Sequence, residues 1–182
     1  MHVGADELAA GLGYIRESPT DAGTLDLIVR RPALGEREVL EEGQLDLAVG
    51  LVGDTWSVRP SSSTPDGSPH PEAQLNIMNA RVAQLVAGSV DRWPLAGDQL
   101  YVDFDLSTQH LPAGSRLAVG DAVIEITAKP HRGCKKFTER FGAEATRFIN
   151  TGPGIALNLR GRNARVVQPG TIRRGDHVTR LS

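Results

Sequence analysis

The chain has 182 residues, of which 20 are Lys or Arg and 22 are Asp or Glu, so its formal net charge is only −2. This length suits a single domain, residues 1–182, with room for a sizeable core. One cysteine excludes an internal disulfide framework and a cysteine-rich zinc site. With neither a basic leader nor an apolar run of membrane-spanning length, we expect a soluble cytoplasmic protein without membrane contact.

Short strands separated by turn residues dominate the pattern. A short helix is expected over 5–12, and alternating or branched residues then predict strands at 25–30, 35–40, 74–78, 99–104, 116–119, 122–127 and 177–181, with further segments at 156–159 and 164–167. The Gly120-Asp121 turn predicts a hairpin. Asn79 predicts the N-cap of a helix over 80–87 that Gly88 ends. These features predict a mainly β (α+β) fold, an antiparallel barrel with two or three peripheral helices and a core spanning about 25–181.

Residues 59–72, RPSSSTPDGSPHPE, form the clearest loop in the chain. They are dense in Pro, Ser and Gly and can bury little apolar surface, so we predict a mobile loop that folds over a ligand. His70, near its end, is more simply an exposed loop histidine.

The small net charge conceals an asymmetry along the chain. Residues 129–174 contain eleven Lys or Arg and two acids, a net of +9, whereas the rest contains nine and twenty, a net of −11. A local positive field on an otherwise acidic protein indicates a bound anion rather than nucleic acid. A solvated basic face would give the same count.

The only cysteine, Cys134, lies in this basic segment, in the run HRGCKK at 131–136. Cations on both sides favour the thiolate, which is a nucleophile and a soft-metal ligand, whereas a buried structural cysteine is rarely flanked by charge. Pro130 and Gly133 end the preceding strand. A helix is then predicted by the spacing of Phe137, Phe141, Ala145 and Phe148, which places Cys134 at or near a helix N-terminus.

Four segments carry a resemblance to a known family: GLVGDTW at 50–56, QLNIMNARV at 74–82, LPAGSRLAVGDAVIEITAKPHRGCKKFTERFG at 111–142 and LRGRNARVVQPGTIRRGD at 159–176. Together they resemble the MOSC domain, named for the C-terminal domain of molybdenum cofactor sulfurase. The resemblance implies a barrel-like fold that holds the molybdenum cofactor (molybdopterin) beside a single cysteine. In members that reduce N-hydroxylated compounds this cysteine ligates molybdenum, and in sulfurases it is thought to carry sulfur as a persulfide.

Applied to this sequence, the resemblance implies that Cys134 is the molybdenum ligand or the persulfide carrier. The residues expected to bind the anionic cofactor are Arg132, Lys135, Lys136, Arg160, Arg162 and Asn158. His131 is expected to hydrogen-bond the thiol or donate a proton, with an ordinary loop histidine as the alternative. Asp54 and Asn163 are more simply turn residues, and Trp56 either walls the pocket or fills the core.

Cofactor sulfurases also carry an aminotransferase-like domain, and amidoxime-reducing relatives carry extra N-terminal sequence; these 182 residues contain neither. The chain thus resembles a stand-alone bacterial MOSC protein, in which no pyridoxal phosphate is expected. Two functions stay open. One is an oxidoreductase that reduces small N-hydroxylated molecules with electrons from a separate donor protein. The other is a non-catalytic cofactor or sulfur carrier served by a sulfur-donor protein. Both need the same thiol and basic pocket, and a cofactor-free barrel is a third alternative.

Overall fold

The computed structural model describes all residues from Met1 to Ser182. Its strands are β1 (Ala22–Arg30), β2 (Glu38–Leu40), β3 (Glu42–Asp46), β4 (Gly50–Leu51), β5 (Leu75–Asn79), β6 (Leu100–Asp103), β7 (Arg116–Val119), β8 (Ala122–Ile126), β9 (Arg162–Gln168), β10 (Gly170–Arg173) and β11 (His177–Arg180). Its α-helices are α1 (Ala5–Arg16), α2 (Ala80–Ala87), α3 (Lys135–Phe141), α4 (Ala143–Asn150) and α5 (Pro153–Ala156). Short 3₁₀ helices cover Thr55–Val58, Pro71–Ala73 and Val90–Ala96.

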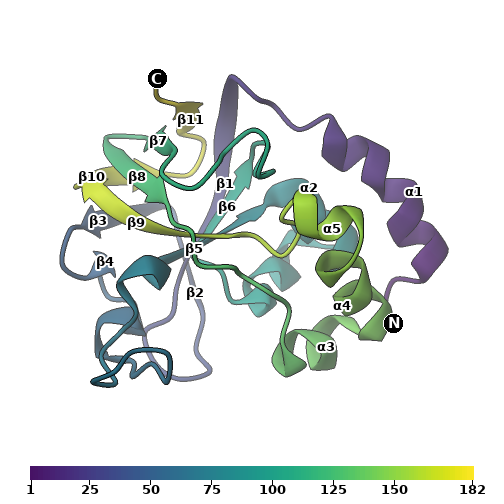
Figure 1. Cartoon of the computed structure of the whole chain (residues 1–182), viewed down its shortest axis with the longest axis horizontal. Coiled ribbons are helices and arrows are strands. Elements are labelled where there is room, and N and C mark those ends of the chain that lie inside the picture. The colour runs from purple at the N-terminus through teal and green to yellow at the C-terminus, as the bar shows by residue number, and fades with distance from the viewer.

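Seven strands form a closed barrel in the order β11-β7-β8-β9-β5-β6-β1, and β1 pairs with β11 to complete the ring (Figure 1). Strand β2 continues the sheet beyond β1, and β10, β3 and β4 form a second, small sheet. The predicted hairpin is confirmed, because β7 and β8 pair antiparallel on either side of the Gly120-Asp121 turn. The prediction of a mainly β barrel is therefore confirmed.

One pairing in the barrel is parallel, so the barrel is mixed rather than purely antiparallel. Strands β5 and β6 run in the same direction, and the chain between them crosses over through α2 and the 3₁₀ helix Val90–Ala96. Parallel neighbours need such a crossover because a tight turn can join only antiparallel strands. Helix α2 is the one predicted, with Asn79 as its N-cap accepting a hydrogen bond from the Arg81 amide at 2.8 Å.

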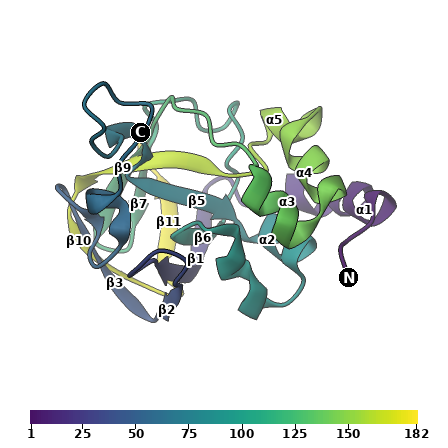
Figure 2. The same ribbon diagram turned by 90° about the horizontal axis from the view of Figure 1, so that it is seen from below.

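The five α-helices gather on one side of the barrel, as Figure 2 shows, and exceed the two or three expected. Between them and the barrel lies a hydrophobic cluster separate from the one inside the barrel. Strand β1 serves both, because successive side chains point to opposite faces: Ile28 packs inside the barrel, whereas Leu27 and Val29 pack against the helices. This explains why the strand reads as an apolar run rather than as a strict alternation.

The helical pattern after Cys134 is divided at Gly142, whose φ of +92° ends α3 before α4 begins. Cys134 is the N-cap residue of α3, so its predicted place at a helix N-terminus is confirmed. The strand-like segment expected at 156–159 is wrong, and so is the turn expected at Asn163. Residues 153–156 form α5, and β9 already begins at Arg162, where pairing with Ile77 of β5 extends the backbone.

Residues 59–70 form a loop between two of the 3₁₀ helices, as the composition indicated. Their mobility stays a prediction. None of the helices is long and apolar enough to cross a membrane.

Candidate functional site

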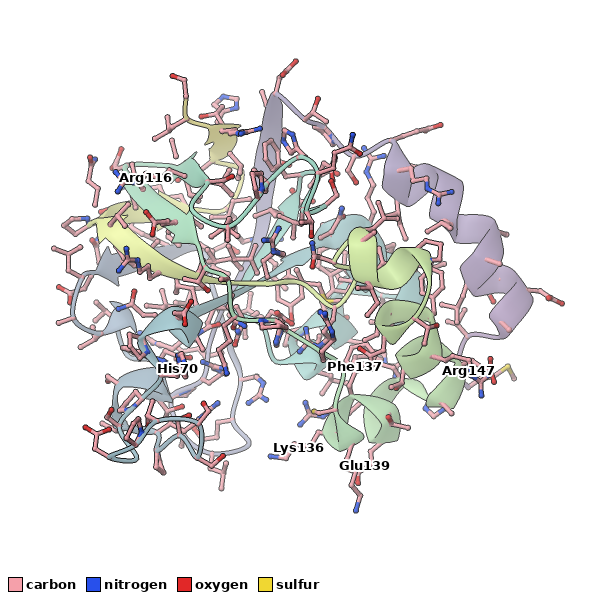
Figure 3. All side chains as sticks on the ribbon, in the orientation of Figure 1. His70, Arg116, Lys136, Phe137, Glu139 and Arg147 are labelled. Atoms are coloured by element: carbon pink, nitrogen blue, oxygen red, sulfur yellow. The ribbon has the colours of Figure 1, made fainter.

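Cys134 is exposed at a cleft of about 460 Å³ between α3 and the segments that follow β1, β5 and β8. The cleft is strongly cationic, because six of its lining side chains are basic and none is a carboxylate. These six are Arg31, Arg37, Arg59, Lys136, Arg140 and Arg160. In Figure 3, Lys136 extends from α3 towards the part of the molecule that carries His70, whereas Glu139 points away from it.

Two of the six cations are neutralised by buried carboxylates behind the cleft wall. Arg31 binds Asp54 at 2.7 Å, with side-chain exposures of 6% and 1%, and Arg160 binds Asp98 at 2.6 Å, with exposures of 7% and 0%. Burial by itself would raise the pKa of Asp54, but hydrogen bonds and charge from Arg31 hold that pKa below its ordinary value. Both ion pairs therefore stay charged at neutral pH and belong to the fixed structure.

The other four cations have no carboxylate partner within 4.0 Å: Arg37, Arg59, Lys136 and Arg140. Burial, and after it repulsion from Arg140 and Arg31, lowers the pKa of the Arg37 guanidinium. Holding like charges together in this way is unfavourable unless an anion joins them. Arg160 adds a buried Nε–H without any hydrogen-bond partner. The donor set therefore fits an anionic ligand.

The segment that carries the thiol, residues 128–134 and here called the thiol loop, is fixed by three side chains from elsewhere in the fold. Asn163 in β9 donates to the carbonyls of Lys129 and Pro130, at 3.0 and 3.2 Å. Asp98 meets Nε2 of His131 at 3.3 Å. Asn150 at the end of α4 binds both peptide groups of Gly133, at 2.9 and 3.1 Å.

Gly133 is required at this place because the thiol loop approaches α4 closely. A β-carbon there would lie 2.7 Å from Cδ1 of Ile149 and 3.1 Å from the Asn150 amide. A larger residue would require the ends of the Ile149 and Asn150 side chains to shift, which disturbs the double hydrogen bond with Asn150. The position of Cys134, one residue further along, depends on this contact.

His131 is a fixed part of the cleft rather than an exposed loop residue, with a side-chain exposure of 18%. Burial, followed by the charge of Arg160, lowers its pKa, and the hydrogen bond to Asp98 only partly opposes this. Burial would raise the pKa of Asp98, but Arg160 and His131 lower it. Since the ionised carboxylate can only accept, Nε2 of His131 donates and Nδ1 of the neutral ring is an acceptor.

Of the site residues expected from the sequence, Cys134, His131, Lys136 and Arg160 line the cleft together. Arg132 and Lys135 do not. Arg132 is exposed and donates to the carbonyl of His131, and the Lys135 side chain is 91% exposed with Glu139 as its nearest acid, at 4.0 Å. Lys135 lies on the surface because the turn of α3 directs the adjacent Lys135 and Lys136 to different sides.

Arg162 and Asn158 also lie outside the cleft lining. The Arg162 guanidinium is buried and donates to the carbonyls of Leu106 and Leu111, at 3.1 and 2.8 Å. The Asn158 amide likewise donates to the Leu106 carbonyl, at 3.1 Å. Both side chains thus support the connection between β6 and β7. Asn163, expected in a turn, lies in β9 and holds the thiol loop.

The sequence did not point to four of the cleft cations: Arg31, Arg37, Arg59 and Arg140. The first three lie in the part of the chain whose net charge is acidic. Meanwhile several cations of the basic window are neutralised by acids from outside it, in the pairs Arg165–Glu125, Arg173–Glu42 and Arg174–Glu41. The sequence contained one signal for two of these cations, since Arg31 and Arg59 each stand directly before a proline that ends a regular element.

Asp54 and Trp56, weighed earlier as turn or pocket residues, have defined places. Asp54 caps the 3₁₀ helix Thr55–Val58 by accepting from the Trp56 amide at 3.0 Å, in addition to its pairing with Arg31. Trp56 is half-buried and belongs to neither hydrophobic core. It lines a smaller hollow beside the cleft.

The sequence model of the MOSC domain matches residues 69–179, a range that includes Cys134. No curated protein matches the chain. Among solved structures, the YUAD protein from Bacillus subtilis has a TM-score of 0.66 at 15% identity, over 87% of this chain and 95% of its own. YiiM from Escherichia coli has a TM-score of 0.56 at 17% identity, over 87% and 70%. YiiM from Geobacillus stearothermophilus has a TM-score of 0.57 at 11% identity, over 88% and 75%. At these identities the structural likeness shows the fold alone.

Replacing Asp98 by Asn should destabilise the protein by about 3–5 kcal/mol, because Arg160 would keep a buried charge without its counter-ion. Glu42→Gln is the matched control. Its partner Arg173 is 55% exposed, and loss of this surface pair should change stability by less than about 1 kcal/mol. Urea denaturation followed by circular dichroism measures both changes. Equal effects of the two substitutions would show that Asp98 does not hold the cleft wall.

The lowered pKa of His131 predicts a loss of stability in mild acid. Below about pH 6.5, the ordinary histidine pKa, the unfolded chain binds more protons than the folded one, so the free energy of unfolding falls as the pH decreases. The fall from this cause ends once folded His131 is also protonated. His131→Gln should flatten the dependence of the free energy of unfolding on pH. His177→Gln, at an exposed position of β11, should leave this dependence unchanged. Urea denaturation at a series of pH values tests this, and an unchanged slope in His131→Gln would contradict it.

Proposed function

The chain belongs to the MOSC domain family, which is associated with molybdenum cofactor binding, and we propose that its cleft holds this cofactor with Cys134 as a ligand of the metal. The observation that carries the proposal is the exposed thiol at the edge of a cleft with six cations and no carboxylate. A thiolate is a soft ligand and suits a metal that the cofactor already binds through sulfur.

The residues that would hold the anionic end of the cofactor are the cleft cations without a carboxylate partner. Arg37 donates from Nε and one amino group to the carbonyls of Pro94 and Glu36, so its other amino group is the donor left for a phosphate. Arg140 uses one amino group on the Leu95 carbonyl, which leaves the rest of its guanidinium for a phosphate, and Lys136 adds a point charge. The unpaired Nε–H of Arg160 supplies one further donor at the buried end. Arg162 and Asn158 are not assigned to the cofactor, since neither lines the cleft and both donate to carbonyls between β6 and β7.

We assign the protein the two-electron reduction of small N-hydroxylated molecules. The N–O bond breaks, the substrate takes up two electrons and two protons, and an N–H compound and water are formed. When bound, the cofactor supplies the redox-active metal for this exchange. The electrons come from a separate donor protein, because one cysteine cannot supply the thiolates of an iron–sulfur cluster.

His131 is the cleft residue to which we assign a relay of protons. Its ring is neutral with Nε2–H bonded to Asp98, so a proton bound for the substrate is first taken up at the acceptor Nδ1 and then passed on. Histidine is the side chain whose ordinary pKa lies nearest to neutrality, and here Asp98 fixes its orientation through Nε2. The same hydrogen bond holds the thiol loop, so His131 both orients the loop and faces the cleft.

The exposure of Cys134 favours a second candidate, a sulfur carrier. The thiolate would attack the outer sulfur of a donor protein's persulfide, so that the donor leaves as a thiolate and Cys134 becomes a persulfide. No net oxidant is needed for this exchange. An exposed thiol is open to such a protein partner, whereas a ligand deep in the cleft would not be.

Cys134→Ala should abolish N–O reduction and leave the fold intact. The side chain is exposed and makes no capping hydrogen bond at the start of α3, so little packing is lost. The protein would be produced in a host that makes the cofactor, analysed for molybdenum, and assayed for reduction of benzamidoxime with an artificial electron donor. Wild-type protein that retains molybdenum without reducing the substrate would favour the carrier.

Lys136→Gln should weaken cofactor retention, because Lys136 lines the cleft without an acidic partner. Loss of one charge-assisted hydrogen bond corresponds to about 1.5–3 kcal/mol, or roughly a tenfold or greater loss of affinity. Lys135→Gln is the adjacent control, since its side chain is 91% exposed and does not line the cleft. Molybdenum content after dialysis compares the two variants. Equal retention would remove Lys136 from the site.

A further inference from the structure

A smaller hollow of about 160 Å³, here called the side chamber, adjoins the cleft and shares Arg31, Arg59 and Asn76 with it. Three further side chains give the chamber its own character: Trp56, His70 and Lys129. None of these three lines the cleft at Cys134. The two spaces are thus neighbours with different walls.

The wall of the side chamber is held by bonds within the protein. The indole N–H of Trp56 donates to the carbonyl of His70 at 3.2 Å, which joins the two ends of the intervening loop. The ring of His70 accepts from the Glu72 amide at 3.2 Å and so starts the 3₁₀ helix Pro71–Ala73. The neck of the loop is therefore fixed whatever the motion of its tip, as in a closed Ω-loop.

The groups that line the side chamber suit a ligand that carries an anionic substituent on a planar ring. Lys129 and Arg59 have no carboxylate partner within 4.0 Å, and Trp56 offers a half-buried aromatic surface. The Asn76 amide donates to Oδ1 of Asn163 at 2.6 Å, so its own carbonyl oxygen is directed and can accept. Planar groups stack on indole rings, and cations bind the carboxylate of a ring substituent.

The size of the side chamber sets an upper limit on its occupant. A cavity of about 150 Å³ is enough for one benzene ring. The chamber has about this volume, whereas the cleft has about 460 Å³. The chamber thus accommodates a single ring with a small substituent.

We propose that the side chamber is the substrate subsite, which binds the ring of a carboxylate-bearing aromatic N-hydroxylated compound through Lys129, Arg59 and Trp56. This assignment rests on the proposed function, since it places the N–O group on the side of the ring that faces the cleft. Arg59 and Asn76, which line both spaces, mark the passage between them. Lys129 is then the residue that determines the preference for an acidic substrate.

The first test uses cofactor-free protein and measures binding alone. The probes are 4-carboxybenzamidoxime and the uncharged benzamidoxime, with affinities from calorimetry. The acidic probe should bind more tightly, and Lys129→Gln should weaken it about tenfold, as expected for loss of one charged hydrogen bond, without changing the neutral probe. Lys135→Gln is the matched control, because its side chain is 91% exposed and lines neither the chamber nor the cleft, and it should have no effect on either probe.

Tryptophan fluorescence locates the probe. Binding should quench Trp56, and the signal should vanish in Trp56→Phe, which keeps Trp93, whose exposure is only 7%. Equal affinity for both probes would overturn the subsite. The subsite would also be overturned if Lys136→Gln weakened binding of the acidic probe and Lys129→Gln did not, because the probe would then occupy the cleft.

The second test uses protein loaded with cofactor and compares kcat/KM for the two probes. Lys129→Gln should lower the ratio of acidic to neutral substrate about tenfold and leave molybdenum content unchanged. A loss of molybdenum in Lys129→Gln would overturn the subsite, because the chamber would then hold part of the cofactor. Wild-type protein that retains no molybdenum but still binds the acidic probe through Lys129 would reject the cofactor proposal and leave the chamber as an acid-binding site.

Discussion

The buried carboxylate of Asp98 is the interaction on which the cleft depends. One of its oxygens accepts from Arg160 at 2.6 Å and the other meets His131 at 3.3 Å. Arg160 lies two residues before the start of β9, and its guanidinium lies 5.3 Å from the ring centre of Phe137 in α3. One fully buried charge therefore connects the barrel, the thiol loop and the helix that Cys134 begins. A buried carboxylate is tolerated only when it is paired in this way, so the three segments are held in one arrangement.

The cations of the cleft divide into two groups with different tasks. Arg31 and Arg160 are buried and paired, and their positions are set by Asp54 and Asp98. The four unpaired cations repel one another, which raises the free energy of the cleft as it stands. An anion that binds there relieves this repulsion, and its binding stabilises the folded state. The chain contains 22 Asp and Glu residues, but these acids lie elsewhere and do not neutralise the four cations.

The barrel provides a rigid support because its wall is packed on both sides. Strands β1, β5 and β6 place alternate residues in the inner core and in the core beneath the helices. On β6, for example, Leu100 and Val102 point inward while Tyr101 points to the helices and donates to the Trp93 carbonyl at 2.7 Å. Loops that leave the ends of such strands, including those of Arg31 and Asp98, start from fixed points.

Features that depend on chemistry within a few residues could be predicted from the sequence. The apolar runs, the Gly-Asp turn, the Asn79 cap and the spacing of Phe137 and Phe141 act over a few residues, and the barrel, helix α2 and the start of α3 followed from them. Cys134 stood out because it is the only cysteine. The MOSC family was recognisable from motifs that span most of the chain.

Which charged side chains lie next to one another depends on the folded chain and could not be predicted. Arg31, Arg59 and Lys136 are far apart in the chain and converge because the closed barrel brings the ends of different strands together. Adjacent lysines separate because a helix turns them to different sides, and Arg162 leaves the site because carbonyls of a distant loop bind it. A count of charge along the sequence cannot register such pairings, since ion pairs form between neighbours in space.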